Sequence, residues 1–192
     1  MTTTAASYSA TLRLGPSGRA VAQEMDPALL EALQHHLNLE RAASSTYFAM
    51  AIWFGERELR GFSSFFKEEG QSEQEHAGRF ADYLIARGQT VELHDLSAPR
   101  QDYESAEEIM AASFQLEVDV TSSLQQIYAI AERSADLRTT TFLDPVVEAQ
   151  VASEHEFAHL FGRVRFAQGQ PAAILIIDNE LSDGKHSPAS LS

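Results

Sequence analysis

The sequence contains no cysteine among its 192 residues. Disulfide bonds, thiolate nucleophiles and zinc sites with cysteine ligands are therefore excluded. Basic residues are also few, with 14 Lys and Arg against 28 Asp and Glu, and the formal net charge is −14. Proteins that bind nucleic acid usually carry the opposite sign, so we expect no nucleic-acid partner. The acidic balance suits cations, and it equally serves solubility.

Long hydrophobic runs are missing as well. No window approaches the roughly 18 consecutive apolar residues of a membrane-spanning helix, so we expect no membrane partner. Acidic residues are absent from positions 1–23, which are rich in Thr, Ser and Ala and contain Arg13 and Arg19. This composition fits a flexible tail and also resembles an organelle transit peptide. We expect a cytoplasmic protein with a flexible segment at 1–25, and residues 1–23 keep a plastid location open.

Apolar residues recur at helical spacing in four long segments, which predicts four amphipathic helices of about 25 residues. Aspartate followed by proline predicts a capped start for two of them, and serine three residues before glutamate has the spacing of a capping box. The four predicted starts are Asp26-Pro27, Phe62, Ser105 with Glu108, and Asp144-Pro145.

The stretch from Gly88 to Glu104 is long and irregular and contains Pro99. Loops of this length are uncommon, and here the loop allows the chain to travel the length of a bundle and begin a parallel helix. Residues 173–181 predict one further short helix. We therefore expect an all-α domain at 26–184, a four-helix bundle with one long crossover, followed by a flexible tail at 185–192.

Each predicted helix has one apolar stripe that a carboxylate interrupts near its middle. The interrupting residues are Glu40, Glu73 with His76, Glu117 and Glu154. Four buried carboxylates at one depth would repel strongly, and no Lys or Arg lies on these stripes to pair with them. A pair of divalent cations would supply the missing charge. Carboxylates with an imidazole suit iron or manganese, and Glu73-x-x-His76 is the spacing used in di-iron bundles.

Other candidate ligands lie on different helical faces. Glu156 and His159 repeat the Glu-x-x-His spacing, but on a face that is not apolar, so we interpret them as outward-facing and Glu154 as the ligand. Tyr47 lies two turns beyond Glu40 on the same face and could hydrogen-bond a ligand, give up an electron, or be a plain core aromatic. Three other histidines are interpreted as surface residues: His35, His36 and His94.

At these residues the sequence resembles the non-haem, prokaryotic-type ferritins. The likeness covers about residues 26–184. It rests on Leu37-Asn38-Leu39-Glu40 with Tyr47, Glu73-Gln74-Glu75-His76 with 80–84, Glu117, the Glu154 region and 177–182. The resemblance implies a ferritin-like four-helix bundle with one long crossover and a short C-terminal fifth helix. It also implies a homo-oligomeric shell of about 24 subunits. Fe(II) would be oxidised by O2 or peroxide at a ferroxidase centre with two irons per subunit, and ferric mineral would be stored inside; no haem is expected.

The resemblance also implies residue roles. Glu40, Glu73 and His76 would hold the first iron, Glu73 would bridge, and Glu117 and Glu154 would serve the second iron. Tyr47 stands beside the centre, so Glu73 and Tyr47 are the catalytic candidates. Glu154 is assigned to the fourth-helix position where the family commonly has glutamine, and Ser72, Ser153 and Phe157 to those of a third iron site. Candidate iron-transit residues are Asp144 at a three-fold channel, then Glu148 and Glu69.

Several alternatives stay open from the sequence. A haem-containing bacterioferritin would show Glu-x-x-His on two core faces, whereas the second copy here is on another face. The small dodecameric DNA-protecting relatives place their ligands between subunits and lack a fifth helix. Another di-iron carboxylate oxidase could act on an organic substrate with the same fold. A non-redox helical bundle, structural or partner-binding, is the alternative from a different functional class.

Overall fold

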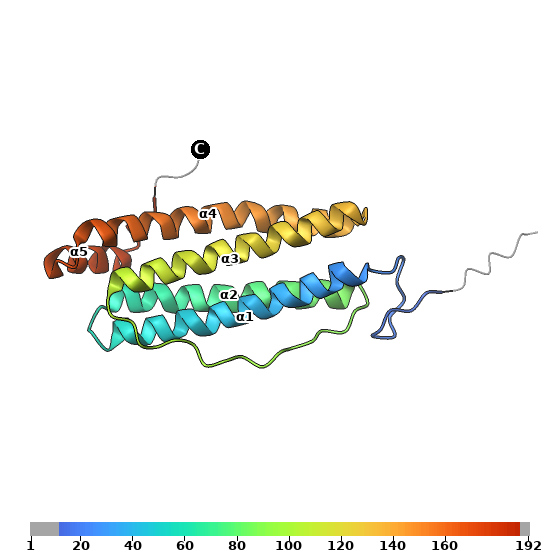
Figure 1. Cartoon of the computed structure of the whole chain (residues 1–192), viewed down its shortest axis with the longest axis horizontal. Coiled ribbons are helices and arrows are strands. Elements are labelled where there is room, and N and C mark those ends of the chain that lie inside the picture. Colours follow the sequence, from blue (N-terminus) through green and yellow to red (C-terminus); the bar gives the residue numbers. More distant parts are fainter. Residues whose placement is uncertain (1–11, 189–192) are drawn as a thin grey trace, which may run out of the picture.

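The computed structural model describes residues 12–188 of the chain. Four long helices lie side by side as a bundle, and a short fifth helix packs at one end of it (Figure 1). The described residues contain no β-sheet, and none of their helices is long and apolar enough to cross a membrane. The helices are α1 (Pro27–Gly55), α2 (Arg60–Ala86), α3 (Ala106–Arg133), α4 (Leu137–Ala167) and α5 (Pro171–Ser182). The predicted all-α bundle with a short C-terminal helix is confirmed.

Two apolar clusters fill the interior of the bundle. One gathers aromatic side chains towards α5, including Phe54, Phe62 and Phe157. The other, including Leu33 and Leu84, lies towards the opposite end. The buried acids of α1, α2 and α3 belong to neither cluster and fall between them in sequence on every helix. The bundle therefore has an apolar core that one buried polar layer interrupts.

The start of α4 differs from the prediction. Asp136 caps this helix by accepting a hydrogen bond from the Thr139 amide at 3.2 Å. Therefore α4 begins at Leu137, whereas the predicted start was Asp144-Pro145. Pro145 lies inside the helix, where a proline removes one amide donor and disfavours the backbone that precedes it. Asp144 accepts a hydrogen bond from Tyr128 at 3.1 Å. By contrast, the predicted caps Asp26 and Ser105 both accept hydrogen bonds from the first turns of their helices.

The crossover between α2 and α3 runs along α1 for the length of the bundle (Figure 1). Two side-chain amides of α1 hold it. Gln34 donates to the Thr90 carbonyl at 2.6 Å and accepts from the Glu92 amide at 3.0 Å. Asn38 donates to the Glu92 carbonyl at 2.9 Å and accepts from the His94 amide at 2.9 Å. These four bonds satisfy backbone groups that a loop would otherwise leave to water.

The described part of the N-terminal segment has a defined position. Its residues 12–21 form a hairpin in which Ser17 donates from both its amide and its hydroxyl to the Gly88 carbonyl. A Cβ added at Gly15 would lie 2.3 Å from that carbonyl, so only glycine allows this approach. The hairpin therefore covers the end of α2, where we expected a flexible segment. Residues 1–11, on which the targeting hypothesis also rests, and residues 189–192 of the expected tail lie outside the described residues.

A buried ion pair joins α2 to the start of α4 and generates a stability prediction. Arg87 and Asp136 are both buried and lie 2.6 Å apart. Replacing Asp136 by Ala leaves the guanidinium buried without its partner and removes the cap of α4. We expect D136A to lose about 3–5 kcal/mol of unfolding free energy, measured by urea denaturation. E58A, which breaks the exposed pair with Arg60, should change it by less than about 1 kcal/mol. A D136A variant as stable as E58A would contradict this reading.

Candidate metal centre

Three side chains of the buried layer meet between α1 and α2. Glu40 comes from α1, and Glu73 and His76 come from adjacent turns of α2. Their ligand atoms all lie within 4.8 Å of one another, and His76 Nδ1 is 2.8 Å from Glu73 Oε2. Both carboxylates are buried, while His76 is partly exposed. The structure thus brings together three of the five residues that the sequence predicted as metal ligands.

Glu117 of α3, the fourth predicted ligand, is buried among hydrogen-bond donors. Its Oε1 accepts from the Tyr47 hydroxyl, and its Oε2 accepts from Gln150 Nε2 at 2.9 Å and Ser153 Oγ at 2.8 Å. The Tyr47 ring stacks on Phe157 with 5.5 Å between centroids. Tyr47 is therefore fixed at both its ring and its hydroxyl, beside a carboxylate of the layer.

The electrostatics of the layer favour a cation. Burial raises the pKa values of Glu40 and Glu117, and it raises the pKa of Glu73 to about 7. Burial together with the Glu117 carboxylate also raises the pKa of Tyr47 well above its usual value. One oxygen of Glu40, Oε2, is buried without a hydrogen-bond partner. Buried carboxylates without a Lys or Arg in contact, joined by one imidazole, are a donor set that suits iron, so these residues fit iron.

The fifth predicted ligand, Glu154, belongs to a wrongly assigned stripe. The stripe was drawn through Val147 and Val151, but these are 38% and 50% exposed. The residues that α4 buries lie on a neighbouring face, displaced by about one residue around the helix, and include Leu143, Gln150, Phe157, Leu160 and Val164. Gln150 therefore lies against Glu117, whereas Glu154 hydrogen-bonds the Thr121 hydroxyl. Sequence reasoning missed Gln150, although counting back by sevens from Phe157 would have found it.

His36 was also predicted wrongly, as a surface residue. It is completely buried, because it lies one turn before Glu40 and faces the same interior. Its Nε2 lies 2.9 Å from Glu40 Oε1, and burial lowers the pKa of His36 to about 3. His35 and His94 are exposed, as expected.

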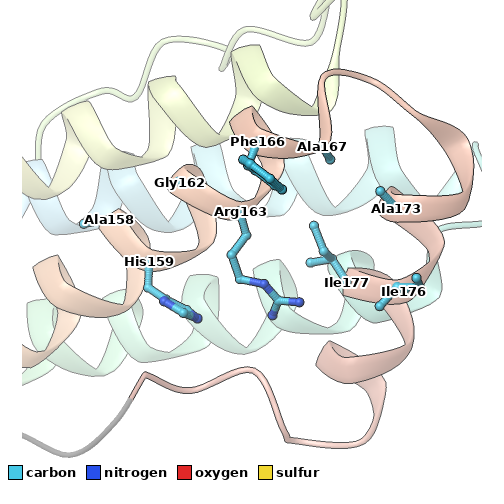
Figure 2. Close-up of a pocket in the computed structure, with 9 residues that line it drawn as sticks. All are labelled: Ala158, His159, Gly162, Arg163, Phe166, Ala167, Ala173, Ile176 and Ile177. Atoms are coloured by element: carbon cyan, nitrogen blue, oxygen red, sulfur yellow. The ribbon is translucent and has the colours of Figure 1, made fainter.

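The second Glu-x-x-His pair lies outside the layer but is not fully exposed. Glu156 is partly buried and approaches His186 of the C-terminal segment at 3.0 Å. His159 lines a cavity of about 500 Å³ between α4 and α5, together with Arg163 and Ile177 (Figure 2). Arg163 pairs with Glu180 at 2.5 Å across these two helices. We assign this cavity to the packing of α5 on α4.

The three candidate transit residues lie at different depths. Asp144 and Glu148 are exposed on α4. Glu69 is partly buried, and its pKa is raised to about 8 by burial and then by the carboxylates of Glu156, Glu117 and Glu73. Glu69 is therefore the transit candidate that lies electrostatically closest to the layer.

A four-helix bundle with one long crossover and a buried Glu/His layer defines a class of carboxylate-rich metal-binding bundles. A family model described as a ferritin-like domain matches residues 30–167, and this chain belongs to the ferritin family.

Relatives and solved structures agree with this membership. The chain is 31% identical over 129 residues to a bacterial non-heme ferritin of Staphylococcus haemolyticus, covering 67% of this chain and 78% of the relative. A bacterial non-heme ferritin of Staphylococcus aureus is 33% identical over the same coverage. An open-pore ferritin of Archaeoglobus fulgidus has a TM-score of 0.81 and 28% identity, covering 83% of this chain and 98% of that one. The resemblance to non-haem ferritins is confirmed.

The raised pKa of Glu73 predicts how the stability of the metal-free protein depends on pH. The folded state holds this proton up to about pH 7, whereas the unfolded chain releases it near 4.5. Stability from this group is therefore fully present below 4.5 and is lost as pH rises through 7. We expect the Tm of metal-free protein to fall by about 5 °C between pH 6 and pH 8.

Two comparisons make this thermal measurement specific. The E73Q variant has no titratable carboxyl at this position, so its Tm should vary less between pH 6 and pH 8. Co(II) supplies the missing positive charge and should remove most of the fall in the unsubstituted protein. A metal-free protein whose Tm rises from pH 6 to pH 8 would contradict the assigned cause.

Proposed function

We propose that this protein oxidises Fe(II) at a two-iron ferroxidase centre and stores the ferric product inside a closed shell of its own copies. Family membership and the fold support an iron-storage ferritin. The observation that supports the oxidation chemistry is the buried layer of Glu40, Glu73, His76 and Glu117. This layer joins carboxylates and one imidazole without a neutralising Lys or Arg in hydrogen-bond contact.

The proposed ligands divide into two groups. The first iron is held by Glu40, Glu73 and His76, whose ligand atoms already converge. Glu73 bridges to the second iron, which Glu117 holds. Gln150 is better placed than Glu154 to complete the second position, because it contacts Glu117 and Glu154 does not share that contact. Gln150 and Glu154 are both candidate ligands of the second iron.

The chemistry is an electron transfer from iron to an oxidant. Two Fe(II) ions each lose one electron, and O2 takes both electrons with two protons to leave as hydrogen peroxide. Peroxide as the oxidant takes two electrons and two protons and leaves as two water molecules. The protein holds the two ions in a low-dielectric layer and keeps their ligands oriented before reaction. Tyr47 orients Glu117 through its hydroxyl and is an oxidisable side chain in direct contact with that carboxylate.

The remaining elements of the proposal concern storage. Asp144 and Glu148 lie on the exposed surface of α4 and are suited to guide Fe(II) inward, with Glu69 as the last step. We propose a homo-oligomeric shell of about 24 subunits, a cytoplasmic protein and a centre without haem. The different-class alternative is a bundle without redox chemistry. A di-iron oxidase for an organic substrate would be favoured if electron microscopy showed no hollow shell.

Removing Glu73 tests the oxidation centre. Anaerobic protein is loaded with two Fe(II) per subunit, air is admitted, and the ferric absorbance is followed by stopped flow. We expect E73A to slow the fast phase by about 100-fold or more, because both ions lose a shared ligand. The matched control is E75A, an exposed glutamate two residues further along the same helix, which should oxidise iron normally. Equal rates in E73A and E75A would refute a ferroxidase at this layer.

A pair of α4 variants decides between Gln150 and Glu154. Anaerobic titration with Co(II) should show two sites per subunit in the unsubstituted protein. We expect Q150A to weaken the second site by about 10-fold, since it removes a group in contact with Glu117. E154A should leave both affinities within about 3-fold of the unsubstituted protein, because its contact is with Thr121. The reverse ranking would make Glu154 the ligand.

A further inference from the structure

His36 is buried beside the proposed iron site, yet it is not among the converging ligand atoms. Its ring packs against Phe80 with 4.3 Å between centroids. Its Nδ1 lies 2.9 Å from Ser123 Oγ on α3, and its Nε2 lies 2.9 Å from Glu40 Oε1. The imidazole thus stands between a hydroxyl of one helix and a carboxylate of another.

The hydrogen positions on this imidazole follow from its two neighbours. The form of Glu40 that binds a cation is the unprotonated carboxylate, which can only accept hydrogen bonds, so in that form the facing Nε2 carries a hydrogen. Burial disfavours the doubly protonated ring, which leaves Nδ1 as an acceptor. The Ser123 hydroxyl can donate to it. Ser123 therefore holds Nδ1 in a contact that is compatible with the tautomer offering a donor to Glu40.

Glu40 has His36 as its neighbouring side-chain donor, whereas Glu117 has several. Glu117 accepts hydrogen bonds from three side chains, and Glu73 is paired with His76. Glu40 faces the Glu73 carboxylate on one side and His36 on the other. His36 is the uncharged donor within reach of Glu40.

The contact between these two residues is close but incomplete. Although Nε2 lies 2.9 Å from Oε1, neither Nε2 nor Glu40 Oε2 has a hydrogen-bond partner of good geometry. Buried polar atoms without hydrogen-bond partners destabilise the fold, so a bound group that supplies a partner would be stabilising here. A cation taking Oε2 would satisfy that oxygen, and a carboxylate turned so that Oε1 meets the Nε2 hydrogen in line would satisfy the nitrogen.

We propose that His36 is a positioning residue of the iron site: held by Ser123, it donates to Glu40 and presents the other oxygen of that carboxylate to the first iron. The inference rests on the proposed function, since it assigns Glu40 to that iron. Partners of this kind fix the orientation of a ligand and typically change metal affinity by about 10–100-fold when removed.

Variants of His36 and Ser123, with His35 as a control, test the proposal by Co(II) binding, without any turnover. Anaerobic titrations follow the visible Co(II) bands and the binding heat, and size-exclusion chromatography with circular dichroism checks assembly. H36L replaces the imidazole by an apolar side chain of similar bulk that has no hydrogen-bond donor. We expect it to weaken the first Co(II) site by about 10-fold and to shift the visible bands of the bound Co(II). H36Q offers both an N–H donor and a carbonyl acceptor, and should recover affinity to within about 3-fold of the unsubstituted protein.

His35 supplies the matched control, because it is exposed on the same helix one position earlier. H35L should bind Co(II) like the unsubstituted protein. If H36L fails to assemble, S123A keeps the imidazole but removes the hydroxyl that holds its Nδ1, and it should weaken the first site by about 3-fold. A folded H36L with unchanged affinity and bands, or in its absence an unchanged S123A, overturns the positioning role. Unsubstituted protein that binds no Co(II) would instead overturn the proposed function, and this inference with it.

Discussion

Repulsion among buried carboxylates is the constraint around which this bundle is arranged. Glu40, Glu73 and Glu117 lie between two apolar clusters, so water cannot screen them from one another. Isolated charges in such surroundings cost several kcal/mol each, and the raised pKa values of these acids express that cost. The apolar clusters at either side must supply enough stability for the helices to hold the layer closed. The fold therefore stores, in its metal-free form, the electrostatic strain that binding two cations would relieve.

The donors that surround these carboxylates are hydroxyl, amide and imidazole groups rather than Lys or Arg side chains. Tyr47, Gln150 and Ser153 direct donors at Glu117, and His76 lies against Glu73. A lysine or arginine in these positions would pair the carboxylates permanently and compete with a metal ion. Uncharged donors orient the oxygens while leaving their net charge available. The guanidinium pair that the described residues bury, Arg87 with Asp136, lies at the end of α2 and joins helices instead.

Much of the fold could be predicted from the sequence because it depends on local signals. Asp26 and Ser105 cap helices as their spacing indicates, and the irregular stretch after Gly88 is the crossover. The start of α4 was missed because Asp144-Pro145 has the local chemistry of a helix start. Asp136, the residue that caps α4, also depends on Arg87, which is 49 positions away in the chain. Asp136 thus combines a local cap, through the Thr139 amide, with a contact to a distant residue that no local pattern reveals.

The candidate site was predictable in proportion to the strength of each apolar stripe. Glu73 and His76 lie on a face with Phe66 and Phe80, and the structure confirms that they meet Glu40. On α4 the stripe is weak, since exposed valines alternate with buried residues, and the predicted stripe lies about one residue around the helix from the buried face that carries Gln150. Glu154 as a ligand stays a prediction. His36 was misjudged because histidine is equally at home on a surface and in a core. Its burial depends on Ser123 and Phe80, which belong to other helices and have no signature near it in sequence.

The hold of α1 on the crossover makes part of that loop intolerant to changes in length. Gln34 and Asn38 are one helical turn apart, and they bind the backbone at alternate residues, Thr90, Glu92 and His94. One turn of the helix thus matches two residues of the extended chain, so successive amides on α1 reach successive inward-facing backbone groups of the loop. One residue inserted between 90 and 94 would exchange the inward and outward backbone groups on one side of the insertion and break the bonds made there. Variation in loop length among relatives is therefore expected after His94, towards Pro99.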